Sequence, residues 1–153
     1  MIRTAKLKDV DTLVYLRRIF CKEDGHECKN SKKLFSEIIS SKTLGIVFVY
    51  EQNRIIIGYA ILIKTYSLEF YGRDALLDEL FIMSDFRGDG IGSKLLAWVI
   101  KYAKKLKLTY LHLETMDTNS RAFGYYQKKG FRTRKSSHLV LPLKKSLPYP
   151  VCS

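Results

Sequence analysis

The feature that most constrains the fold is a stretch in which an apolar run, closely spaced glycines and a helix-forming segment follow one another. Residues 76–83 are mostly apolar and predict a strand, and residues 93–107 have apolar side chains at helical spacing. Between them, glycine occupies every second position: Gly88, Gly90 and Gly92. Backbone N–H groups without neighbouring side chains can approach a ligand closely, and a helix N-terminus adds the positive end of its dipole. The stretch therefore predicts a strand–turn–helix unit with a binding site for a diphosphate.

Known phosphate-binding patterns test which diphosphate this turn could hold. A nucleotide P-loop requires Gly-x-x-x-x-Gly-Lys followed by Ser or Thr, but the residue five positions after Gly88 is Ser93. A dinucleotide fingerprint requires Gly-x-Gly-x-x-Gly, and the place of its third glycine is again Ser93. Glu114, at the end of the next predicted strand, lies where a ribose-binding acid would be expected, so a dinucleotide remains an alternative ligand. A plain strand–helix turn without a ligand is the other alternative.

The pattern that the turn does match is Arg-x-x-Gly-x-Gly, formed by Arg87, Gly90 and Gly92. It resembles the pyrophosphate loop of the GNAT N-acetyltransferases, which bind acetyl-coenzyme A. Residues 119–131 resemble the second signature of that family, Asn-x-x-Ala-x-x-x-Tyr-x-x-x-Gly-Phe. Both patterns occur in the family's order, and the resemblance extends over residues 76–131. It implies acetyl-coenzyme A as the co-substrate and no metal cofactor.

The resemblance also implies which residues hold the cofactor. The backbone at the end of the predicted strand would hydrogen-bond the pantetheine arm, and the glycine turn would bind the diphosphate, with Arg87 in direct contact. Asn119, at the start of its helix, is expected either to cap that helix or to contact the cofactor arm. The expected cofactor-binding residues are Leu80, Phe81, Ile82, Arg87, Gly88, Asp89, Gly90, Ile91, Gly92, Ser93, Asn119 and Tyr126.

Acetyl transfer to an amine requires a base for the acceptor's proton, donors for the oxyanion and a proton for the leaving thiolate. Tyr126 matches the tyrosine of the family signature and is the expected general acid, since a phenol stays protonated at neutral pH. Glu79 is the expected base, acting through a water, because an acid within an apolar strand requires partners or a function. Asp78 should point to the opposite face of the strand. A core tyrosine and a strand-end salt bridge are the alternative interpretations of Tyr126 and Glu79.

The acceptor amine is indicated less directly. Residues 78–93 resemble the diamine and spermidine acetyltransferase branch of the family. Three acids lie between the first two predicted helices, where this family shapes its acceptor site, and their carboxylates would suit a polycation: Glu23, Asp24 and Glu27. We therefore expect a small diamine or polyamine, held by these acids and by Glu79. A solvated acidic loop is the alternative interpretation of the three acids, and a protein or peptide is the alternative acceptor.

Charge is distributed unevenly along the chain. The net charge is +12, but residues 1–85 carry 13 Lys and Arg against 12 Asp and Glu, whereas residues 86–153 carry 14 against 3. The basic part contains the glycine turn, so its field would steer a phosphate-rich cofactor towards that turn. A solvated lysine-rich helix face would carry the same charge. No nucleic-acid-binding motif accompanies the charge, so a nucleic-acid-binding module is kept only as the non-enzymatic alternative.

Length and cysteine content set further expectations. A chain of 153 residues suits one domain with its own core. It has no apolar run of about 18 residues and no apolar signal core at its N-terminus, so we expect a cytoplasmic protein that does not cross a membrane. An odd number of cysteines without a Cys-x-x-Cys pair predicts free thiols, and no fourth metal ligand is evident near Cys21, His26 and Cys28. Dimers are common in the diamine branch, so homodimer formation is left open.

The remaining patterns predict an α/β (α+β) fold. The order of elements is β-α-α-β-β-β-α-β-α-β, which is similar to the GNAT order: a mixed sheet of about six or seven strands flanked by about four helices. Strands 76–83 and 109–115 should be parallel, because a helix connects them. A doubly wound dinucleotide fold would need several such units. The tail, residues 144–153, is expected to be loose. The predicted strands are residues 2–6, 45–51, 55–66, 76–83, 109–115, 131–134 and 138–143, and the predicted helices are residues 9–20, 31–40, 93–107 and 120–129.

Overall fold

The computed structural model describes residues 1–115, 119–135 and 139–143. The chain forms two compact units, residues 1–114 and residues 115–153, and each is described by itself. The strands found in the described residues belong to the first unit and are β1 (Ile2–Thr4), β2 (Gly45–Gln52), β3 (Ile55–Ser67), β4 (Gly72–Ile82) and β5 (Leu111–His112). The helices of the first unit are η1 (Leu7–Asp9), α1 (Val10–Glu23), α2 (Ser31–Ser40), η2 (Ser84–Phe86) and α3 (Ile91–Lys105), and the second unit contains α4 (Ser120–Lys128).

The first unit is built around a five-stranded sheet in the order β1-β2-β3-β4-β5. Neighbouring strands from β1 to β4 are antiparallel, whereas β4 and β5 are parallel, as the connecting helix predicted. The β2–β3 hairpin turns through Asn53 and Arg54, both of which have positive φ (51° and 65°). Such a turn has the twist that antiparallel strands require.

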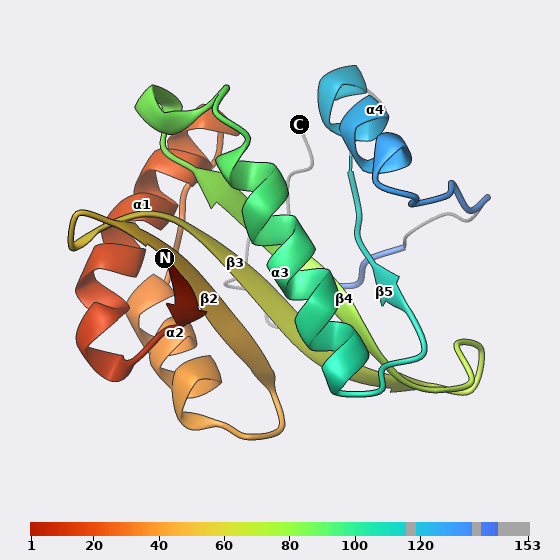
Figure 1. Ribbon diagram of the computed structural model, residues 1–153. Coiled ribbons are helices and arrows are strands. Elements are labelled where there is room, and N and C mark those ends of the chain that lie inside the picture. Colours follow the sequence, from red (N-terminus) through yellow and green to blue (C-terminus); the bar gives the residue numbers. More distant parts are fainter. Residues whose placement is uncertain (116–118, 136–138, 144–153) are drawn as a thin grey trace. The chain divides into compact units, whose positions relative to one another are not determined.

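Helices cover both faces of this sheet (Figure 1). α1 and α2 pack on one face, where Leu13 and Phe35 join the same core cluster as Val49 of β2. The neighbouring side chain on β2 points the other way: Phe48, directly before Val49, is fully buried and packs edge-on against Tyr102 of α3, with 5.1 Å between ring centroids. Because side chains alternate along a strand, one apolar strand supplies the core on both faces.

β4 carries a bulge at the two acids of the sequence. Ile61 of β3 pairs with Glu79, but the next residue, Leu62, pairs with Leu77, so Asp78 has no partner of its own on β3. An extra residue of this kind changes which face the following side chains point to. The bulge thus decides the orientation of Glu79 relative to the earlier part of β4.

β4 and β5 pair over only two positions. Ala75 pairs with Leu111 and Leu76 pairs with His112, and no further pair of these strands is found in the described residues. β5 is therefore much shorter than the predicted strand, residues 109–115. β4 itself continues to Ile82, so its edge beyond Leu76 has backbone groups outside this ladder.

In the second unit, α4 is fixed at both ends by the residues that the sequence indicated. Asn119 caps the helix, since its Oδ1 accepts a hydrogen bond from the N–H of Ala122 over 3.0 Å. After the helix, Gly130 adopts φ 95°, a conformation that favours glycine. The expected last strands are not found where the structure describes them, in residues 131–134 and 139–143, and residue 138 lies outside the described residues. The described sheet therefore has five strands rather than six or seven.

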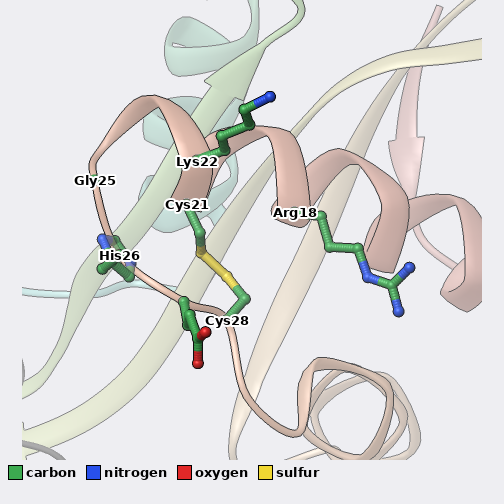
Figure 2. A pocket seen from close by; sticks show the side chains of 7 residues that line it. Arg18, Cys21, Lys22, Gly25, His26 and Cys28 are labelled. Atoms are coloured by element: carbon green, nitrogen blue, oxygen red, sulfur yellow. A yellow bond between two sulfur atoms is a disulfide. The ribbon is translucent and has the colours of Figure 1, made fainter.

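The prediction of free thiols is wrong for two of the three cysteines. Cys21 at the end of α1 and Cys28 are joined by a disulfide, with their Cα atoms 5.9 Å apart (Figure 2). The chain turns after α1 and brings Cys28 back beside the helix, where its Sγ also contacts the carbonyl oxygen of Arg17 at 3.5 Å. A spacing of seven residues carries no sequence signature, so only the fold reveals the pair. Cys152 and the tail, residues 144–153, lie outside the described residues.

No helix in the described part of the chain is both long and apolar enough to cross a membrane.

Candidate active site

The glycine turn lies between η2 and α3 and leaves its backbone open. Gly88 and Gly90 have φ of 102° and 74°, and a Cβ atom added to either would meet no atom within 4 Å. Gly90 is the N-cap of α3, whose first N–H groups point out of the helix. Phe81, Ile82 and Ile91 are buried, so these expected cofactor contacts could reach a ligand only through their backbone. The turn has the features of an anion-binding helix N-terminus.

Arg87 holds the end of β4 to the end of α1. Its Nε donates to the carbonyl oxygen of Ile82 over 2.7 Å, and its Nη2 pairs with Oε2 of Glu23 at 2.6 Å. The guanidinium also lies over the ring of Phe81, 5.3 Å from the centroid. The residue expected to bind the diphosphate and one of the acids expected to bind the acceptor are therefore partners in this structure.

Glu79 lies in a buried hydrogen-bond network on the face of the sheet covered by α1 and α2. Only 9% of the residue is exposed. Its Oε1 accepts from Nε of Arg17 over 2.8 Å, and its Oε2 accepts from the hydroxyl of Tyr59 over 2.7 Å. Arg17 also donates to Oγ of Ser31 over 3.0 Å, which links α1 to the start of α2. Each oxygen of Glu79 thus has a donor, which offsets the cost of burying the carboxylate.

Two ionisable side chains close to the Glu79 carboxylate, Tyr59 and Asp78, have raised pKa values. Burial, followed by the nearby Glu79 carboxylate, raises the pKa of Tyr59. Asp78 is exposed, but surrounding protein atoms remove part of its hydration, and together with the charge of Glu79 this raises the pKa of Asp78. Asp78 and Glu79 therefore differ in exposure, but the bulge at Asp78 interrupts the alternation from which the opposite orientation of the two side chains was predicted.

Tyr126 is half-buried in the second unit. Its ring packs edge-on against Phe131 at 5.6 Å and against Tyr125 at 5.2 Å between centroids. Burial, with a smaller contribution from Tyr125, raises the pKa of Tyr126 to about 12. The phenol is therefore protonated at neutral pH, which is the form that a general acid requires.

The three acids between α1 and α2 do not converge on one point. Glu23 pairs with Arg87, whereas Asp24 lies 3.8 Å from Nδ1 of His26. Glu27 lines a pocket together with two cationic side chains and the disulfide (Figure 2). The residues that line this pocket are Arg18, Cys21, Lys22, Gly25, His26, Glu27 and Cys28. The sulfur atoms of Cys21 and Cys28 and an imidazole nitrogen of His26 lie within 4.8 Å of one another, but sulfur atoms joined in a disulfide are not thiolate ligands.

One ionisable pair was missed by the sequence analysis. Asp74 of β4 is 1% exposed, and its Oδ2 lies 2.9 Å from Nε2 of His112 on β5. The two residues are 38 positions apart, so no local pattern joins them. The alternation of residues 109–115 did place His112 on a strand next to β4, which was the one available signal.

Comparison with known proteins defines the class to which this fold and site belong. Residues 13–131 match the model of the Acetyltransferase (GNAT) family, and the chain belongs to that family. Thialysine N-epsilon-acetyltransferase of Bos taurus is 32% identical over 79 residues, which are 52% of this chain and 46% of that protein. The protein of the same name from Mus musculus is 29% identical over 79 residues, with the same coverage. The match spans about half the length of these curated relatives.

Solved structures agree on the fold along most of the chain. An integron cassette protein from the mobile metagenome of Cole Harbour Salt Marsh has a TM-score of 0.83 at 26% identity, covering 94% of this chain and 90% of that chain. A possible acetyltransferase from Clostridium difficile 630 has a TM-score of 0.85 at 17% identity, covering 94% and 97%, and supports the fold alone.

Proposed function

We propose that the protein is an acetyl-coenzyme A-dependent N-acetyltransferase that acts on a primary amine. The observation that carries the proposal is the open glycine turn at the start of α3, together with the edge of β4 that lies outside the β5 ladder beyond Leu76. A helix N-terminus suits the diphosphate of coenzyme A, and a free strand edge suits its pantetheine arm. Membership of the GNAT family supports acetyl as the transferred group.

In this proposal the backbone of residues 80–82 holds the pantetheine arm, and residues 87–93 hold the diphosphate. Arg87 reaches the diphosphate when it leaves Glu23, and both side chains are about 40% exposed, so the exchange is accessible. The net charge of residues 86–153 attracts the phosphates over a longer range. Asn119 caps α4 through its hydrogen bond with Ala122 and is not needed as a cofactor contact in this proposal.

The proposed reaction is direct attack. The amine nitrogen attacks the carbonyl carbon of the thioester, the C–S bond breaks, and the thiolate takes a proton from the hydroxyl of Tyr126. Glu79 accepts a proton of the new ammonium group through a water. An N–H of the free β4 edge donates to the oxyanion. The raised pKa of Tyr126, about 12, supports its role, because the phenol holds its proton until the thiolate forms.

The proposed acceptor is a small amine, with a diamine or polyamine ahead of a peptide N-terminus or a protein lysine. The names of the curated relatives, thialysine N-epsilon-acetyltransferases, support a small molecule with a terminal amino group. The acids between α1 and α2 would supply the carboxylate for the distal ammonium: Asp24 or Glu27, or Glu23 once Arg87 binds the diphosphate instead. The near-neutral first part of the chain would not repel such a cation.

Calorimetry with coenzyme A, acetyl-coenzyme A and NAD tests the cofactor. The proposal predicts one coenzyme A site per chain and no heat from NAD, whereas NAD binding without coenzyme A binding would contradict it. A gel-shift titration with RNA and DNA at low and high salt tests the non-enzymatic alternative. Tight, salt-sensitive binding in a chain that acetylates no amine would favour a nucleic-acid module.

A further inference from the structure

Asp74 is a carboxylate buried in an unusual way. Its side chain is 1% exposed, and one oxygen, Oδ2, meets Nε2 of His112 at 2.9 Å. The other oxygen, Oδ1, is buried and has no hydrogen-bond partner among the described residues. A buried charge requires partners, so this carboxylate depends on a single imidazole.

The imidazole of His112 is held in place but remains reachable. Its ring stacks on Phe70, with 5.0 Å between centroids and 17° between planes. The side chain is 34% exposed. If Asp74 is ionised, its carboxylate can only accept hydrogen bonds, and Nε2 of His112 then carries the proton and donates it to Asp74. This tautomer leaves Nδ1 as an unprotonated, basic nitrogen, for which no hydrogen-bond partner is seen in the described part of the chain.

The pair lies on the same face of the sheet as Glu79. Leu76 pairs with Ile63, which packs on the core under α1 and α2, so Leu76 and its other neighbour, His112, face that side. Asp74 is two residues before Leu76 and faces it too. Without the bulge, an odd separation would put Asp74 and Glu79 on opposite faces. Because the bulge at residue 78 adds one residue to β4, the side chains of Asp74 and Glu79 face the same side of the sheet.

The pair also lies where the free edge of β4 begins. Leu76–His112 is the last β4–β5 pair of the described chain, and the free edge proposed to hold the pantetheine arm follows it. On β3, Leu76 and Glu79 are opposed by Ile63 and Ile61, two positions apart, which corresponds to about 7 Å along the strand. Because His112 is one strand further out than Leu76, its imidazole would reach an acceptor amine beside Glu79 through a bridging water rather than by direct contact.

We infer that His112 is a catalytic proton acceptor of the acetyl transfer and that Asp74 is its positioning residue; the inference rests on the proposed function. As the amine nitrogen bonds to the carbonyl carbon, its excess proton passes to Nδ1 of His112, while the C–S bond breaks and the thiolate takes the proton of Tyr126. The imidazolium formed is balanced by Asp74. In this inference His112 takes the place of Glu79 as the acceptor of that proton, because both oxygens of Glu79 already accept hydrogen bonds; the buried Glu79 network then holds α1, α2 and β4 together around the acceptor.

Two substitutions separate this role from a structural one. His112→Gln keeps an N–H that can donate to Asp74 but removes the basic nitrogen. Asp74→Asn keeps the shape, but its amide can donate to Nε2, which moves the imidazole proton to Nδ1. Each variant should lower kcat by about 10²–10⁴ while the KM for acetyl-coenzyme A and the melting temperature change little. Tyr110→Phe, which alters another ring beside Phe70, is the matched control and should keep kcat.

Chemical rescue adds a readout that a purely structural role would not move. Imidazole added to His112→Ala should restore part of kcat, with no effect on the wild type. A wild-type kcat in His112→Gln would overturn the inference. So would a loss of kcat that is accompanied by a lower melting temperature in every variant and is not restored by imidazole.

The tautomer can be read without any turnover. The chain has three histidines, and a ¹⁵N spectrum of their side chains, with His112→Gln for assignment, should show His112 protonated at Nε2 and not at Nδ1. Asp74→Asn should reverse this. Protonation of wild-type His112 at Nδ1 would contradict the inference about His112 and would leave the proposed function unaffected. A wild-type chain with the predicted tautomer but no acetyl transfer to any amine contradicts both the proposed function and the catalytic role of His112.

Discussion

Arg87 and Glu23 form an ion pair between the turn that follows β4 and the last residue of α1, with Nη2 and Oε2 separated by 2.6 Å. The pair joins the proposed cofactor side of the site to the proposed acceptor side. Because both partners are partly exposed, the pair contributes little to stability and can exchange partners. Binding of a diphosphate to Arg87 would release Glu23 for an acceptor ammonium, which would couple the two ligands.

The first prediction concerns this coupling. Glu23→Gln frees Arg87 in the absence of cofactor, so the Kd for coenzyme A should fall by about two- to fivefold, the range of one exposed ion pair. Arg87→Ala should instead weaken binding. Calorimetry of the two variants measures both effects, and Asp11→Asn, which alters an exposed acid paired with Lys32, is the control. An unchanged Kd in Glu23→Gln together with full binding by Arg87→Ala would show that Arg87 does not contact the diphosphate.

The second prediction concerns the buried network of Glu79. Glu79→Gln keeps the side-chain shape but removes the charge that Arg17 and Tyr59 satisfy, so the free energy of unfolding should fall by about 1–3 kcal/mol. The rate of transfer should also fall. Denaturant unfolding measures the first effect, and Asp78→Asn is the neighbouring control, expected to lie within about 0.5 kcal/mol of wild type. Equal stability of Glu79→Gln and wild type would mean that the network is not formed in solution.

The third prediction concerns the acid. Tyr126→Phe keeps the ring contacts with Phe131 but removes the hydroxyl, so kcat should fall by about 10²–10⁴ with an unchanged Kd for coenzyme A. Because the pKa of Tyr126 is raised to about 12, its proton is still present at pH 10, and the wild-type rate should not decline between pH 8 and 10 through loss of this acid. Wild-type kcat in Tyr126→Phe would mean that solvent protonates the thiolate.

The fourth prediction concerns the disulfide. It closes a loop with a sequence separation of seven residues, and removing it should lower the free energy of unfolding by about 2–3 kcal/mol through the entropy of the unfolded chain. A reductant should therefore lower the melting temperature of the wild type by about 5–10 °C. The variant carrying Cys21→Ser and Cys28→Ser should melt at the reduced temperature and should not respond to reductant. An oxidised wild type with the same melting temperature as the double variant would contradict this prediction.

The sequence predicted the elements that depend on local chemistry. α2 was expected at residues 31–40 and is found there, because its apolar residues recur at helical spacing. The N-cap position is occupied by Asn30, and Ser31, the first residue of the helix, accepts a hydrogen bond from Arg17. For Asn119 the sequence allowed either a helix cap or a cofactor contact, and its hydrogen bond with Ala122, three residues away, shows that it caps the helix.

Features that depend on long-range contact could not be predicted. The length of β5 depends on where its ladder with β4 ends, and Cys28 pairs with Cys21 because of how the chain turns. The face that Glu79 shares with Asp74 depends on a bulge that alternation cannot reveal. Likewise, nothing in the sequence indicates that Arg87, a residue of the cofactor motif, pairs with an acid 64 positions away.

The most direct test of the account is release of the coenzyme A thiol when the full chain is mixed with acetyl-coenzyme A and a panel of amines: putrescine, spermidine, thialysine, lysine and short peptides with free N-termini. We predict thiol release with at least one small primary amine, at a higher kcat/KM than with any peptide, and with a KM that rises with salt because the contacts to the acceptor are partly exposed. Release with peptides alone would contradict the small-amine acceptor and keep the acetyltransferase. No thiol release above the rate without enzyme, with every amine, would contradict the central claim.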